Sequence, residues 1–110
     1  MLTSILNRAT GCALYAGALI LAGWAASLAA GPVAFDRYMI ALGSPLGKLA
    51  LFGLTVSIFY HLAAGIRHLV WDAGEGLQTK TADMTAAAAM AFAVAASIAV
   101  WVIAAITGAL

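Results

Sequence analysis

Charged residues are scarce in this chain. Five basic and four acidic side chains make up 8% of its 110 residues, whereas a soluble domain carries about 25%. So few charges cannot cover the surface of a water-soluble protein of this size. The net charge of +1 provides no basic surface for DNA or RNA. The composition therefore excludes a soluble enzyme domain and a nucleic-acid-binding protein.

Cysteine is almost absent as well. Cys12 stands alone, which excludes an internal disulfide and a metal site built on paired cysteines. Apolar residues dominate the chain instead: 65% of its residues are hydrophobic and its mean hydropathy is +1.07. Because a membrane crossing takes about 20 apolar residues, the chain holds at most four spans and no separate catalytic domain.

Three long apolar stretches are separated by two polar breaks. The stretches cover roughly residues 5–30, 46–71 and 84–107. Gly31-Pro32 is a strong helix stop. Each stretch exceeds the ~18 residues of a spanning helix and none alternates like a barrel strand. The sequence therefore predicts an all-α membrane protein with three transmembrane helices, forming a single anchor domain over residues 1–110.

Two details of this topology remain open. Within the first stretch, Arg8 is followed by an apolar run that ends in small residues, which is also typical of a secretory signal, although this run is longer than a signal core. The basic residues lean slightly toward a cytoplasmic N-terminus. The alternation of three spans is the firmer prediction, and it places the start of the first helix and the end of the second on one membrane face.

The third stretch has small residues four positions apart. Ala89, Ala93 and Ser97 would form a seam for close packing of a neighbouring helix. The alternative is that they are part of an alanine-rich filler. The composition of this stretch supports both interpretations equally.

Polar residues of the second stretch fall on one helical face. At roughly 100° per residue, His61, Gly65, His68 and Asp72 lie within about 60° of one another, and Ser57 and Gly53 extend the same stripe. A histidine in hydrocarbon needs a partner, and small neighbours leave room for a flat group. Haem with an imidazole ligand fits this pattern. A histidine hydrogen-bonded to another helix fits it too.

The spacing of the two histidines constrains the haem hypothesis. His61 and His68 are about 10.5 Å apart along a helix axis, so they cannot ligate one iron together. A second histidine ligand would have to come from another chain. His68, nearer the membrane face, suits a haem propionate, or a lipid headgroup in the absence of haem.

The start of the first stretch holds a second polar pair. Ser4 and Arg8 are one helical turn apart and share a face. The guanidinium of Arg8 can bind a carboxylate or a carbonyl. The alternative is an arginine that only reaches toward the membrane surface.

Two segments resemble a known family. SILNRATG at residues 4–11 and YHLAAGIRHLVWDAG at residues 60–74 are similar to the cytochrome b-type large membrane-anchor subunit of succinate dehydrogenase, complex II. Its patterns are S-x-x-x-R-x-[ST]-G and H-x-x-x-G-x-R-H-x-x-x-D. The resemblance implies that His61 is the axial ligand of a haem b shared with a second anchor, and that Ser4 and Arg8 line a ubiquinone site. It also implies that Arg8 and His68 lie near the haem propionates, and that Asp72 has a role in proton supply or in structure.

The resemblance also implies partners in the lipid bilayer. They are a second small hydrophobic anchor, an iron–sulphur subunit and a flavoprotein, so that electrons from succinate reach ubiquinone in the tricarboxylic acid cycle and respiratory chain. The chain itself would not be catalytic. The anchor of a quinol:fumarate reductase and a cofactor-free helix bundle are the alternatives.

The chain departs from the family pattern at two places. Many members have histidine where this chain has Asn7. Only three residues precede Ser4, where the family usually has a longer segment. No targeting presequence is visible, so we expect a bacterial inner membrane rather than a mitochondrial one.

Overall fold

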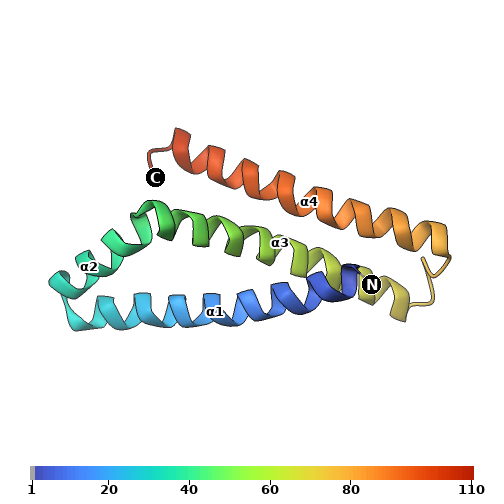
Figure 1. The fold of residues 1–110 in the computed structure, drawn as a ribbon, viewed down its shortest axis with the longest axis horizontal. Coiled ribbons are helices and arrows are strands. Elements are labelled where there is room, and N and C mark those ends of the chain that lie inside the picture. Colours follow the sequence, from blue (N-terminus) through green and yellow to red (C-terminus); the bar gives the residue numbers. More distant parts are fainter. Residues whose placement is uncertain (1) are drawn as a thin grey trace.

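Four α-helices make up the part of the chain that the structure describes, residues 2–110 of a computed structural model. They are α1 (Leu2–Ala30), α2 (Pro32–Gly43), α3 (Pro45–Asp72) and α4 (Thr79–Ile106) (Figure 1). Helices α1, α3 and α4 are long and apolar enough to cross a membrane. The predicted all-α fold with three spans is confirmed, with helices that begin a few residues earlier than expected.

Helix α2 lies in the first predicted break, where no helix was expected. Gly31 has φ 121° and lets the chain turn, and Pro32 stands in the first turn of α2, where its missing N–H costs no hydrogen bond. The Tyr38 hydroxyl donates to the carbonyl of Ile20, which ties α2 back onto α1. At about 18 Å, a helix of this length is too short to span a membrane.

Local signals also define the ends of α3. The Ser44 side chain caps its start and accepts from the backbone N–H of Gly47 at 3.1 Å. Gly74 and Gly76, both at positive φ, form the turn after its end. The indole of Trp71 donates to the carbonyl of Gly76 at 3.1 Å and holds this turn against α3.

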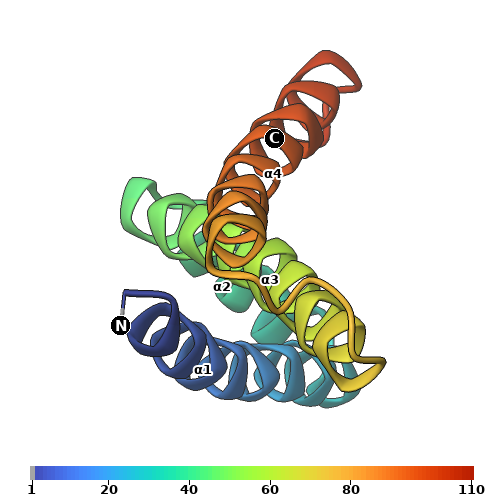
Figure 2. The ribbon, with the colours of Figure 1, turned by 90° about the vertical axis from the view of Figure 1, so that its right-hand side faces the viewer.

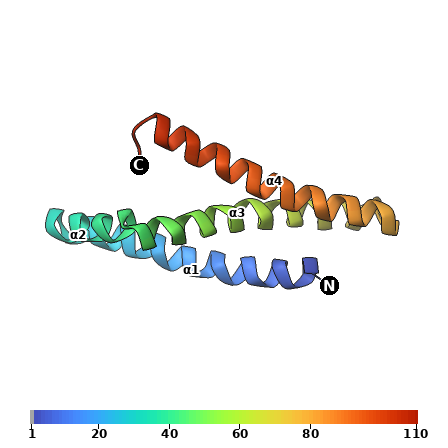
Figure 3. The same cartoon turned by 45° about the horizontal axis from the view of Figure 1, so that its top comes forward.

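Helix α3 lies between α1 and α4 (Figures 1 and 2). The start of α1 lies beside the end of α3, as the alternation of spans predicts (Figure 1). Helix α4 lies along the C-terminal half of α3 and diverges from it toward its own C-terminus (Figure 3). There the Trp101 indole bridges back to the Thr55 hydroxyl of α3 at 3.1 Å.

The small core lies between α3 and α4. Its buried hydrophobic residues are Tyr60, Ala64, Ala89 and Ala93, and Ser97 of α4 is fully buried. Of the two interpretations of this stretch, the structure supports the packing seam, because Ala89, Ala93 and Ser97 are the buried residues of α4. Helix α1 buries none of its described residues, and its apolar side chains are available to lipid or to other subunits.

Candidate functional site

His61 sits where α3 meets α1. Its ring is half-buried, and its Nδ1 lies 3.2 Å from the hydroxyl oxygen of Thr10 on α1. A Cβ added to Gly11 would lie 3.5 Å from Cε1 of His61, so the ring rests close to the backbone of α1. Within residues 2–110 the other ring nitrogen, Nε2, makes no hydrogen bond. One nitrogen is therefore held and the other is free.

Glycines leave the face of α3 beside His61 open. A Cβ built on Gly53 or on Gly65 would meet nothing within 4 Å. Ser57 adds little bulk, since its hydroxyl folds back and donates to the carbonyl of Gly53 at 2.8 Å. A free imidazole nitrogen beside an open helix face of small residues suits haem, whose iron takes an imidazole and whose macrocycle needs space.

A polar cavity of about 180 Å³ opens between the start of α1 and the end of α3. Its lining residues are Thr3, Ser4, Asn7, Tyr60, Ala64, Arg67, His68 and Trp71. The structure thus brings Ser4 and His68 onto the wall of one cavity. Asn7, where many family members have histidine, lines it too.

Arg8 is exposed beside this cavity rather than part of its lining. Its Nη2 donates to the Ser4 hydroxyl at 3.1 Å and its Nε lies 3.4 Å from the Ser4 carbonyl. One donor group of the cavity wall is therefore coupled to the guanidinium.

His68 and Asp72 differ in how they are placed. Nδ1 of His68 donates to the carbonyl of Ala64 at 2.6 Å, and its ring packs edge-on against Trp71 with centroids 5.1 Å apart. Asp72 is exposed at the last residue of α3 and does not line the cavity. The predicted site residues therefore gather at one end of the helices, with Asp72 at its margin.

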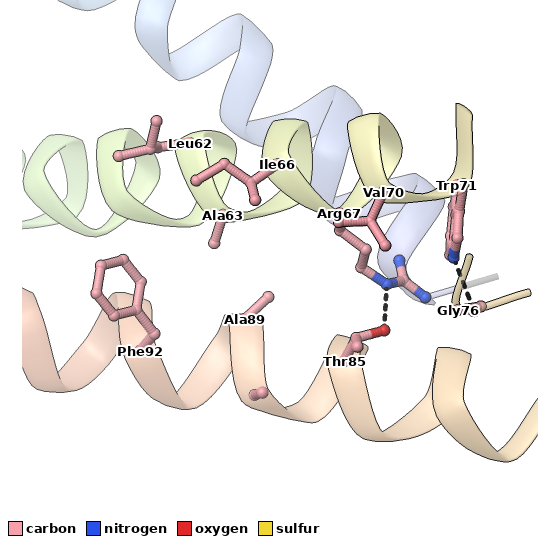
Figure 4. Close-up of a pocket in the computed structure, with 11 residues that line it drawn as sticks. Leu62, Ala63, Ile66, Arg67, Val70, Trp71, Gly76, Thr85, Ala89 and Phe92 are labelled. Carbon is pink, nitrogen blue, oxygen red and sulfur yellow. Dashed lines mark hydrogen bonds between the residues drawn. The ribbon is translucent and has the colours of Figure 1, made fainter. Parts of the chain in front are cut away.

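Arg67 lines the cavity, although the sequence predicted no site role for it. Its Nε donates to Thr85 at 3.0 Å and its Nη2 to the carbonyl of Ala82 at 2.9 Å, both on α4. Its guanidinium carbon lies 4.1 Å from the ring centre of Trp71. Arg67 lines the polar cavity and also an apolar cavity of about 380 Å³ between α3 and α4 (Figure 4).

Arg67 and Thr10 each had a signal in the sequence that could have placed them in the site. Arg67 is about 120° away from His61 around α3, outside the polar stripe, and it is the arginine of the H-x-x-x-G-x-R-H-x-x-x-D pattern, but the sequence assigned it no role in the site. An arginine within an apolar helix needs a partner, and that requirement could have identified it. Thr10 is the hydroxyl position of the S-x-x-x-R-x-[ST]-G pattern and had been given no role.

The fold and the site define a class: a three-span helical membrane subunit with a histidine free to bind a ligand in the interface of α1 and α3. A family model described as "Succinate dehydrogenase/Fumarate reductase transmembrane subunit" matches residues 1–100. The chain therefore belongs to this family, as a cytochrome b-type membrane anchor of complex II.

Individual relatives agree with the family match. The succinate dehydrogenase cytochrome b556 subunit of Paracoccus denitrificans is 39% identical over 90 residues, covering 82% of this chain and 69% of the relative. The corresponding subunit of Rickettsia bellii is 37% identical over 101 residues, covering 90% and 77%. The mitochondrial cytochrome b560 subunit of Bos taurus is 36% identical over 103 residues, covering 89% and 59%.

Proposed function

We propose that this chain holds one haem b jointly with a second anchor chain and forms part of the ubiquinone site of a succinate dehydrogenase. The observation that carries the proposal is the environment of His61: Nδ1 is held by Thr10, Nε2 is free, and glycines keep the adjoining face of α3 open. The relatives are named cytochrome b subunits, which supports haem binding. When bound, haem b supplies a one-electron redox centre.

The second axial ligand would come from another chain. His68 is two turns further along α3, about 10.5 Å from His61 along the axis, and its Nδ1 is committed to the carbonyl of Ala64. Residues 2–110 contain no third histidine. We assign His68, together with Arg8, to the haem propionates, because both are polar groups at the membrane face toward which α3 ends.

The quinone site would lie at the polar cavity. Ser4 lines the cavity and Arg8 is hydrogen-bonded to Ser4. A quinone carbonyl is neutral when it binds and gains negative charge as it is reduced. A guanidinium stabilises that developing charge more than it stabilises the bound quinone, so Arg8 would act mainly on turnover. The serine hydroxyl would orient the same carbonyl with a neutral hydrogen bond.

We propose a role for Asp72 in proton supply, supported by its exposure at the end of α3. A carboxylate in contact with water, next to a cavity that receives a quinone, can relay protons to that cavity. A structural role at the helix end is the alternative, and replacement of Asp72 by Asn separates the two. Slower quinone reduction in an intact complex would indicate proton supply.

Residues 1–110 would act as one anchor domain without catalytic activity of its own. The partners would be a second small hydrophobic anchor, an iron–sulphur subunit that delivers electrons, and a flavoprotein that oxidises succinate. The bacterial relatives support placement in a bacterial cytoplasmic membrane, and the Bos taurus relative represents the mitochondrial alternative.

An absorption spectrum of the purified complex tests the proposal. We expect the Soret band of a low-spin haem, and its loss in the His61→Ala complex. A complex without haem would instead support a cofactor-free helix bundle. The family description also covers fumarate reductase, and comparing succinate oxidation with fumarate reduction in the same complex distinguishes the two directions.

A further inference from the structure

The hydroxyl of Thr10 has three polar neighbours but only one hydrogen. Its oxygen lies 2.7 Å from the carbonyl of Leu6, 3.1 Å from the carbonyl of Asn7 and 3.2 Å from Nδ1 of His61. Both carbonyls can only accept. The hydrogen therefore points to the nearer carbonyl, that of Leu6, as is usual for a threonine within an apolar helix.

This arrangement determines which nitrogen of His61 carries the proton. With its hydrogen committed to Leu6, the Thr10 oxygen presents a lone pair to the ring, so Nδ1 must be the donor. The opposite assignment would point the hydroxyl hydrogen at Nδ1 and leave two short oxygen–oxygen contacts without a hydrogen. With the proton on Nδ1, Nε2 of His61 carries a free lone pair.

We infer that Thr10 is a positioning residue for the haem ligand: its hydroxyl accepts Nδ1–H of His61, holds the ring in the tautomer that leaves Nε2 free for iron, and makes the imidazole a stronger electron donor. This rests on the proposed role of His61. A histidine ligand whose other N–H is bonded to an acceptor is better oriented and more basic. Here the acceptor comes from a different helix, so the ligand geometry depends on the packing of α1 against α3.

The expected consequence is a shift in the haem rather than a general loss of structure. An imidazole that loses its acceptor donates less to iron, which favours the reduced form, so the haem midpoint potential should rise. Loss of such a partner weakens metal binding by about 10–100-fold. Because the acceptor here is neutral, we expect haem to dissociate about tenfold faster, at the lower end of that range.

The test uses the assembled complex with four substitutions in this chain. Thr10→Val keeps the shape and removes the hydroxyl, Thr10→Ser keeps the hydroxyl, and Thr10→Cys offers a weaker acceptor. Ala9→Val is the matched control: it adds a β-branched side chain at the neighbouring exposed position of α1 and leaves the Thr10 hydroxyl in place. The readouts are the haem potential, the g-values of the oxidised haem and the rate of haem transfer to apomyoglobin.

We expect the potential to rise in the order wild type and Thr10→Ser, then Thr10→Cys, then Thr10→Val, with Ala9→Val unchanged. If Thr10→Val does not assemble, the Thr10→Cys complex decides, since it should still show a raised potential. An assembled Thr10→Val complex with the wild-type potential and g-values would overturn the inference, and so would a Thr10→Ser complex shifted as far as Thr10→Val.

Failure of the inference is distinguishable from failure of the proposed function. A wild-type complex that contains no haem, or a His61→Ala complex with the wild-type spectrum, removes the ligand assignment itself. If the haem disappears in His61→Ala but its potential and g-values are the same in every Thr10 variant, only the role of Thr10 is refuted.

Discussion

The two interfaces of α3 differ in what they bury. Against α4 it packs a seam of small residues, and Ala93 and Ser97 there are 1% and 0% exposed. Against α1 it presents His61 and a polar cavity, and α1 itself buries none of its described residues. The close packing at Ala93 and Ser97 leaves no space there, and the apolar cavity of about 380 Å³ between α3 and α4 lies nearer the end of α3. The buried seam indicates that α3–α4 holds the subunit together, and the proposed haem and quinone roles fall on the more open α1–α3 interface.

Arg67 belongs to both interfaces. Its two hydrogen bonds go to α4, yet its side chain lines the cavity toward α1. It also stacks on Trp71, which in turn contacts His68. The α3–α4 interface therefore supports one wall of the polar cavity between α1 and α3.

The largest effect is expected from the removal of His61. We expect His61→Ala to abolish the low-spin haem spectrum, because no other histidine of residues 2–110 can reach the same iron. His68→Ala is the matched variant and should retain haem with a shifted potential, since an outer contact tunes the metal without holding it. Optical redox titration of both complexes measures this. The reverse pattern would show that the ligand has been assigned to the wrong histidine.

Next in size is the effect of Arg8 on quinone reduction. A hydrogen bond to a charged group contributes about 1.5–3 kcal/mol, so we expect Arg8→Leu to slow quinone reduction about 10- to 100-fold. Ser4→Ala loses a neutral bond of about 1 kcal/mol and should slow it about fivefold.

Paired assays provide the control for both substitutions. Electron transfer from succinate to an artificial dye that accepts before quinone should be retained. Equal loss of dye and quinone activities in Arg8→Leu would show that the residue serves assembly, and its quinone role would be withdrawn.

A third variant tests the structural side. Ala93→Leu forces a large side chain into the seam between α3 and α4, and such overpacking costs about 1–3 kcal/mol. We expect a lower temperature for thermal loss of the haem spectrum, with an unchanged spectrum before melting. Ala91→Leu, at an exposed position of the same helix, is the control. An equal effect of the two would mean that the seam is not a packing surface.

The smallest effect is expected where α3 and α4 diverge. Thr55→Val removes the hydrogen bond from Trp101, and such bonds between membrane helices contribute about 0.6 kcal/mol on average. We expect a melting temperature slightly below wild type and unchanged quinone reduction. Thr107→Val, at an exposed residue beyond α4, should leave both values at wild type. A loss of quinone activity in Thr55→Val would contradict the separation of the two interfaces.

The spans and the polar stripe were predictable because they depend on local properties. Apolar length defines a membrane helix whatever its neighbours are, and a helical period of 3.6 residues places Gly53, His61 and Gly65 on one face before any partner is known. Helix α2 was not predictable in the same way. Its polar residues looked like a connection, and the contacts of Tyr38 and Phe35 with α1 stabilise it.

Residue types and their spacing thus account for the number of spans and for the shared face of the two histidines. They also show that His61 and His68 are too far apart along α3 to bind the same iron. The partners of those residues depend on helix packing. Thr10 is 51 positions from His61, and Arg67 is 18 positions from Thr85. No periodicity within a single helix relates such pairs. They meet because α1 and α4 pack on opposite sides of α3, and that arrangement places a hydroxyl lone pair against one ring nitrogen of His61 and leaves the other free.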